Sequence, residues 1–145
     1  MGNFASGSLG RSVVDMMRSP VEELETVMWK IDNDSFEQLM SGRKKVEIKI
    51  ASSAIKEVQE KKNMIIFFGH DGSKFTIVRR TKFKDFDDLL SRENPEDICP
   101  GKTKEEVLED LRKRFPKSKE RYGVYAYELV PFIPRQPMAH ISYRQ

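Results

Sequence analysis

The sequence predicts a single α+β domain. Three observations support this fold class. The spacing of apolar residues changes along the chain between a period of two, typical of strands, and a period near 3.6, typical of helices. An Asp71-Gly72 dipeptide stands between two apolar runs, which predicts a β-hairpin. Helix starts are marked by Ser, Asp or Thr followed three residues later by Glu. The 145 residues are enough for one hydrophobic core without disulfides or a structural metal.

The first predicted elements are short and have clear start or stop signals. A serine cap followed by proline predicts a helix over residues 19–25, and the β-forming run TVMWKI predicts a strand over residues 26–31. A second cap at Asp34 opens a helix that ends at Gly42, the residue type that readily takes the left-handed conformation after a helix.

From Lys44 to Ile50 the chain alternates apolar and charged residues. Val46, Ile48 and Ile50 point one way, and Lys45, Glu47 and Lys49 point the other. This pattern predicts a half-buried strand with its charged face toward solvent.

The second half of the chain reads as a hairpin, two helices and a closing strand. The run over residues 63–69 is apolar on both faces, which predicts a strand covered on both sides or lining a small closed barrel. The remaining expected elements are a returning strand over 74–82, a helix over 85–90, a loop over 91–102, a helix from Thr103 to Phe115 and a strand over 122–132.

The two ends carry no such patterns. Residues 1–18 are small, polar and glycine-rich, which predicts a flexible arm, and the proline-rich residues 133–145 predict an extended tail. Gly2 and Ser6 fit the pattern for N-myristoylation, so Gly2 is a candidate lipidation site. A single myristoyl chain would give only weak membrane association.

Composition excludes several classes of protein. Cys99 is the only cysteine, and His70 and His140 are the only histidines, so we expect no disulfide, no metal site and no cofactor. The sequence contains no apolar run of membrane-spanning length and no secretory signal, which predicts an intracellular protein, cytoplasmic or nuclear. The net charge is −4 over residues 1–42 and +7 over residues 43–145, a balance compatible with nucleic acid but also common on ordinary surfaces.

Two phrases in the sequence resemble a known family. FEQLMSGRKKVEIKI places Phe36, Leu39, Gly42, Lys44 and Glu47 at the spacing of the F-x-x-I/L-x-x-G-x-K-x-x-E-x-R phrase of ASCH domains, with Lys49 where arginine is usual. The run from residue 81 to RYGVYAYEL is similar to the rest of that domain. The resemblance implies a small PUA-like β-barrel, mixed or antiparallel, of about five or six strands flanked by helices, spanning residues 19–132.

In ASCH-like proteins the segment after the glycine turn borders a cleft proposed to hold RNA or a nucleoside. The resemblance therefore implies a ligand-facing role for Lys44 and Glu47, with RNA, single-stranded nucleic acid or a modified nucleoside as partner. The candidate nucleic-acid-binding residues are Arg43, Lys44, Lys45, Glu47, Lys49, Arg79 and Arg80. Tyr125 and Tyr127 share a face of the last strand and either stack on a base or belong to the core.

Other interpretations remain open from the sequence. Glu47 between Lys45 and Lys49 also fits a purely structural ladder of ion pairs. Some ASCH-like proteins are amidohydrolases of N4-acetylcytidine that use a Gly-x-Lys-x-x-Thr phrase, but Glu47 stands in the threonine position here. If the protein is a hydrolase or nuclease, Lys44 and Glu47 are its candidate catalytic residues. The third alternative is a non-catalytic protein-interaction module.

Overall fold

The computed structural model describes residues 24–133. The predicted arm, the helix start at Ser19, the lipidation candidate Gly2 and nearly all of the predicted tail lie outside these residues. The described chain is α+β, as predicted, with a five-stranded mixed sheet and six helices. The strands are β1 (Glu25–Trp29), β2 (Val46–Ile50), β3 (Asn63–Phe67), β4 (His70–Phe83) and β5 (Val124–Pro131). The helices are α2 (Asn33–Ser41), α3 (Ser53–Lys56), α4 (Phe86–Arg92), α5 (Pro95–Ile98), α6 (Lys104–Arg114) and α7 (Lys117–Glu120).

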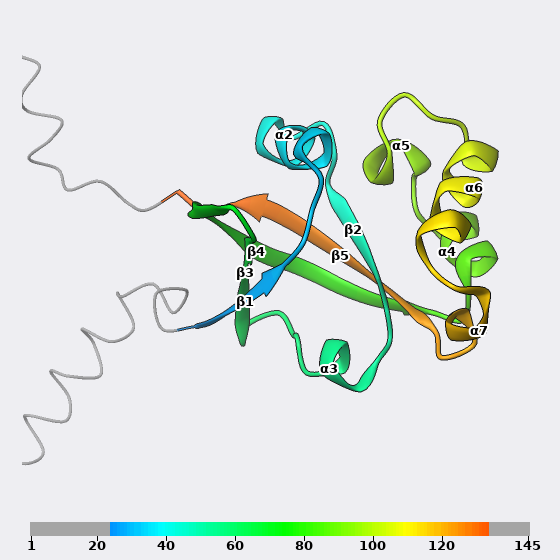
Figure 1. The fold of residues 1–145 in the computed structure, drawn as a ribbon, viewed down its shortest axis with the longest axis horizontal. Helices are drawn as coiled ribbons and strands as arrows, with labels where there is room; N and C mark the ends of the chain where they lie inside the picture. Colours follow the sequence, from blue (N-terminus) through cyan, green and yellow to red (C-terminus); the bar gives the residue numbers. More distant parts are fainter. Residues whose placement is uncertain (1–23, 134–145) are drawn as a thin grey trace, which may run out of the picture.

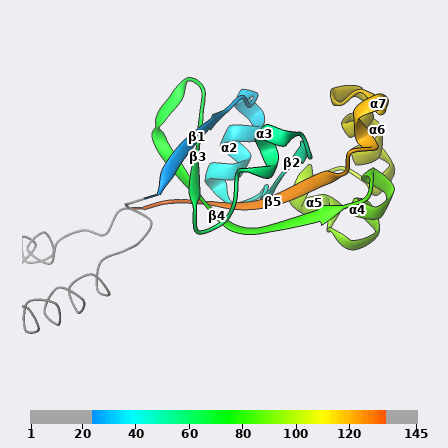
Figure 2. The same ribbon diagram turned by 90° about the horizontal axis from the view of Figure 1, so that it is seen from below.

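The sheet is open rather than closed. Its strand order is β1-β3-β4-β5-β2, with β1 parallel to β3 and all other neighbours antiparallel. Strands β1 and β2 are the two edges and do not pair with each other, so the expected barrel is not closed in the part of the chain that the structure describes. The long strands β4 and β5 run from the β1–β3 end of the molecule to the end where α4–α7 gather (Figures 1 and 2).

The sheet buries both of its faces. One face packs against α2 and the segment that contains α3 through a core that includes Trp29, Phe36, Phe67, Phe75 and Tyr127. The other face packs against α4, α5 and α6 through a core that includes Val46, Ile48, Phe86, Leu89 and Leu111. The prediction that β2 is half-buried is therefore wrong, because residues on both of its faces are inaccessible.

Several boundaries differ from the sequence predictions. The hairpin of β3 and β4 is confirmed, but its turn lies at Phe68-Gly69, where Gly69 has a φ of 87°. Asp71-Gly72 instead falls in the irregularity that shifts the register of this strand pair. The expected loop over 91–102 contains the short helix α5. Asp32, not Asp34, caps α2, because its carboxylate accepts hydrogen bonds from the backbone and side chain of Ser35.

The capping box at Thr103 is confirmed and fixes the start of α6. The Thr103 hydroxyl accepts from the Glu106 backbone at 3.2 Å, and the Glu106 carboxylate accepts from the Thr103 backbone at 2.8 Å. This reciprocal arrangement satisfies two backbone donors that the first turn leaves free. Val107 and Leu111 then bury the apolar stripe of α6 in the second core.

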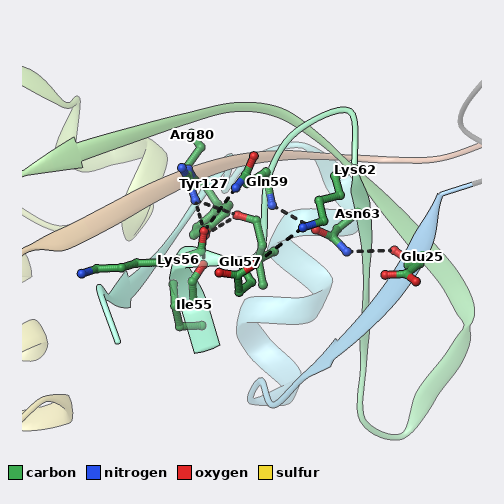
Figure 3. Close-up of polar contacts among 10 residues, drawn as sticks. Glu25, Ile55, Lys56, Glu57, Gln59, Lys62, Asn63, Arg80 and Tyr127 are labelled. Atoms are coloured by element: carbon green, nitrogen blue, oxygen red, sulfur yellow. Dashed lines mark hydrogen bonds and ion pairs between the residues drawn. The ribbon is translucent and has the colours of Figure 1, made fainter. Parts of the chain in front are cut away.

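The hydroxyl of Tyr127 joins the sheet to the segment after β2. It lies 3.0 Å from the carbonyl of Ile55 and 2.8 Å from that of Val58, and its ring is fully buried (Figure 3). Burial raises the pKa of Tyr127 to about 12.

We expect Tyr127→Phe to lower the free energy of unfolding by about 1 kcal/mol, because the variant lacks a buried hydrogen bond while its ring packing is unchanged. Urea denaturation measures this difference. Tyr122→Phe is the matched control, since within residues 24–133 the Tyr122 hydroxyl accepts a hydrogen bond only from the exposed Arg121, at 3.4 Å. Equal midpoints for Tyr127→Phe and the wild type would contradict the role given to this hydroxyl.

Candidate ligand-binding pocket

The side chain of Lys44 lies at the junction between the two cores. Gly42 ends α2 with a φ of 81°, and the chain then turns so that the Lys44 backbone donates to the carbonyl of Gln38. The Lys44 ammonium is only 3% exposed. It donates to the carbonyls of Val46 at 2.8 Å and Ile98 at 2.6 Å, and it lies 3.1 Å from Oε1 of Glu47. Two of the three donors of the ammonium thus bind backbone carbonyls, and Glu47 supplies the opposite charge.

Glu47 is buried beside Lys44 on the edge strand β2. Its side chain is 2% exposed, and Oε2 lies 3.8 Å from the guanidinium of Arg114 on α6. The carboxylate is therefore paired inside the protein rather than presented to solvent, and the pairing supplies the opposite charge that a buried ion requires. Lys44 and Glu47 together link β2, α5 and α6.

Lys49 lies on the same side of β2 as Glu47 but belongs to a different environment. Its ammonium lies 4.6 Å from the centre of the Trp29 ring, a cation–π contact. Burial lowers the pKa of Lys49; Glu47 opposes this shift, and the charges of Arg114 and Lys44 add to it.

A pocket of about 430 Å³ opens next to the Lys44–Glu47 pair. It lies between α2 and α6, the helices that cover opposite faces of the sheet, and is closed on a third side by the segment from α5 to α6. The lining side chains come from Asp32, Asp34, Ser35, Gln38, Lys44, Ile98, Cys99, Pro100, Lys102, Asp110, Leu111, Lys113 and Arg114.

The wall of this pocket carries both signs of charge. The α2 side supplies Asp32 and Asp34, whereas the α6 side supplies Lys113 and Arg114. Lys102 is paired with Asp110 across the loop that precedes α6. Although partial burial opposes the shift, hydrogen bonds from Ser35 hold the pKa of Asp32 below its usual range. The pocket thus has an acceptor-rich side and a cationic side.

Cys99 also lines the pocket. Its thiol is half-buried, and burial raises its pKa despite the nearby charge of Lys44. A thiol in this state is a poor nucleophile at neutral pH, because the thiolate is the reactive form.

The structure brings together only part of the predicted site. Lys44 lines the pocket and Glu47 pairs with it, while Arg43 and Lys45 are exposed neighbours of Lys44 in the chain that do not line the pocket. Arg79 forms a bidentate pair with Glu93 and a 2.9 Å contact to Glu128, which raise its pKa. These contacts place Arg79 in an internal network rather than at the pocket.

Arg80 is likewise engaged within the protein. It donates to the carbonyls of Lys56 and Val58 at 2.9 and 3.0 Å, and Figure 3 shows Arg80 beside Lys56. Its guanidinium lies 4.4 Å from the centre of the Tyr125 ring. Arg79 and Arg80 point to opposite faces of β4, as the alternation predicts. Tyr125 and Tyr127 are both buried in the core, which resolves the alternative left open for them.

Sequence reasoning missed the contribution of α6. Asp110, Lys113 and Arg114 are spaced i, i+3 and i+4, so they share one face of the helix next to the buried stripe. That spacing predicts a charged face on the helix, but it does not indicate which part of the protein this face meets.

Neither a metal site nor a membrane-spanning helix is found among the described residues. Residues 24–133 contain no group of three or more His, Cys, Asp or Glu side chains placed to hold a metal ion. No helix in the same range is long and apolar enough to cross a bilayer.

Comparison with known proteins supports the fold without giving a function. No family model matches the chain, and no curated protein matches it. Among solved structures, the chain is similar to the hypothetical protein PH0355, with 25% identity, a TM-score of 0.68 and coverage of 75% of this chain and 100% of that one. It is also similar to protein PF0455 from Pyrococcus furiosus, with 23% identity, a TM-score of 0.63 and coverage of 75% and 99%. The shared fold is that of a small α+β domain and is consistent with a PUA-like domain.

We expect Glu47→Leu to lower the free energy of unfolding by about 3–5 kcal/mol, because it leaves the Lys44 ammonium buried without its counter-charge. The double variant Lys44→Met/Glu47→Leu should lose less than the sum of the two single variants, since neither charge then remains uncompensated. Chemical denaturation of the four proteins of this cycle gives the coupling. The exposed pair Lys62–Glu57, at 3.6 Å, is the matched control and should show much weaker coupling. Equal coupling in the two cycles would refute the structural role of the buried pair.

Proposed function

We propose that the protein is a binding domain of the ASCH type for RNA or a modified nucleotide, and that the pocket between α2 and α6 is its ligand site. The observation that supports this most directly is a concave site with a fixed, buried Lys44–Glu47 pair in its wall and the cations Lys113 and Arg114 beside it. Its volume of about 430 Å³ falls within the usual range for small-ligand sites.

The two sides of the pocket suit the two ends of a nucleotide. Phosphate oxygens accept hydrogen bonds from lysine and arginine, so the α6 side is suited to the phosphate. The acidic side chains at the start of α2 can accept from an exocyclic amino group of a base. No aromatic side chain lines the pocket among the described residues, so contacts from the acidic side to the edge of the base would hold it instead of a stacked ring.

In this proposal Lys44 and Glu47 do not contact the ligand directly. Their polar atoms are engaged with each other and with the protein backbone, so they fix the wall against which a ligand is placed. Arg43 and Lys45, exposed on either side of Lys44, would add salt-dependent contacts to the backbone of a longer RNA.

We expect Arg114→Gln to weaken binding of 5′-CMP and of a 12-nucleotide single-stranded RNA by about tenfold at low salt, because the variant cannot donate a charge-assisted hydrogen bond to phosphate. Isothermal titration for the nucleotide and fluorescence anisotropy for the RNA measure the two affinities. Arg92→Gln removes an exposed arginine outside the pocket and is the matched control. Equally weakened binding in the two variants, or no nucleotide binding at millimolar concentration, would refute the proposal.

The hydrolase alternative gives a different outcome in a turnover assay. A general base must reach its water within about 3 Å. The Glu47 carboxylate is buried, with one oxygen paired to Lys44 and the other near Arg114. We therefore expect no Glu47-dependent cleavage of RNA and no Glu47-dependent deacylation of N4-acetylcytidine, as measured by gel electrophoresis and chromatography. Product formation that disappears in Glu47→Gln would instead identify a hydrolase, and absence of both binding and turnover would favour an interaction module.

A further inference from the structure

A second hollow, of about 380 Å³, lies where β4 ends and β5 begins. It is lined by Lys82, Phe83, Lys84, Arg121, Tyr122 and Gly123. All three of its charged lining residues are cations. In Figure 1 this end of β4 and β5 lies at the lower right beside α7, whereas α2 and α5, which line the first pocket, lie along the upper edge. The two sites are therefore separate.

Gly123 allows the cations to approach the backbone at this turn. It has a φ of 95°, and a Cβ placed on it would lie 2.9 Å from Cε of Lys82 and 3.3 Å from the carbonyl oxygen of Phe83. The Lys82 side chain thus lies directly against the backbone that follows Tyr122. Since any other residue would be strained in conformation and would displace Lys82, the geometry of the hollow depends on this glycine.

The acidic residues nearby are engaged elsewhere. Glu120 is buried, accepts from the Phe86 backbone at 2.9 Å and pairs with Arg112, which also contacts Asp87 at 3.1 Å. Asp88 accepts from the Lys84 backbone and pairs with Arg92. At this turn, the exposed cations left without an ion pair among the described residues include Lys82, Lys84, Lys119 and Arg121.

Tyr122 stands among these cations with its ring in solvent. Tyr122 is 51% exposed, whereas Tyr125 and Tyr127 are buried. The Arg121 guanidinium lies 5.2 Å from the centre of the ring and 3.4 Å from its hydroxyl, and this hydrogen bond lowers the pKa of Tyr122. The neighbouring arginine therefore holds an exposed aromatic surface in a cationic setting.

An exposed aromatic ring among unpaired cations is the combination used to bind single strands, with cations on the phosphates and bases stacked on the ring. We propose that the Tyr122 patch, defined as Lys82, Lys84, Lys119, Arg121 and Tyr122, binds the phosphates of single-stranded nucleic acid and stacks one base on Tyr122. An acidic peptide would match the charge but would make no use of the aromatic ring. This inference goes beyond the pocket proposal and does not depend on it.

We expect Lys82→Glu/Lys84→Glu to weaken binding of a labelled 12-nucleotide single-stranded RNA by roughly tenfold or more at low salt. The same double variant should reduce the slope of log affinity against log salt by about 0.7 for each phosphate that it no longer neutralises. Tyr122→Ala should also weaken binding roughly tenfold, whereas Tyr122→Phe, which keeps a ring, should retain most of the affinity. Fluorescence anisotropy across a salt series measures all of these variants.

The controls separate this proposal from its rivals. Lys74→Glu changes another exposed lysine of β4 at the opposite end of the strand and should have a much smaller effect. An effect as large as that of the double variant, or unchanged affinity in Tyr122→Ala, would overturn the proposal. So would displacement of the RNA by a 12-residue polyglutamate as efficiently as by unlabelled RNA, because that result identifies a general anion site. Arg114-dependent binding of 5′-CMP reports on the pocket, so its absence together with patch-dependent RNA binding would refute only the pocket proposal.

Discussion

The buried Lys44–Glu47 ion pair is the constraint on which the arrangement of this protein depends. Removing two charges from water costs several kcal/mol for each ion, and the pair compensates only when the remaining donors are also satisfied. Here Val46 and Ile98 supply the two additional acceptors, one from the edge strand and one from the distant helix α5. Because those acceptors come from different layers, satisfying the ammonium also fixes how β2 and α5 meet.

The position of the pair explains why a pocket forms beside it. The two faces of the sheet bury separate apolar cores, one against α2 and α3 and the other against α4–α6. At the free edge of β2, the helices that cover the two faces meet through polar rather than apolar contacts. The pocket lies at this edge. The carbonyl of Val46 is capped by Lys44, which also protects an edge strand that could otherwise pair with another chain.

The sequence predicted the local elements well because their signals are local. The box at Thr103, the left-handed Gly42 and the period-two run in β2 each depend on residues only a few positions apart. The burial of Glu47 was not predictable in this way, since it depends on distant parts of the chain, among them Arg114, 67 positions away. An alternating charged strand has the same pattern whether its charged face meets water or a set of buried partners. The closed barrel was implied by the family resemblance and was one of two interpretations of the apolar run over residues 63–69, and the open sheet order does not support it.

The distribution of cations matters more for function than their total. Several arginines that raise the net charge of the chain are engaged inside it: Arg79 with Glu93 and Glu128, Arg80 with backbone carbonyls, and Arg112 with Asp87 and Glu120. These groups are held by charges or dipoles of the protein itself, so they contribute little to the attraction of a phosphate chain. The lysines around Gly123 differ because the nearby carboxylates are already bound to helix starts and arginines. A net charge of +3 therefore understates the local field at that turn, and it is the local field that governs contact with an anionic partner.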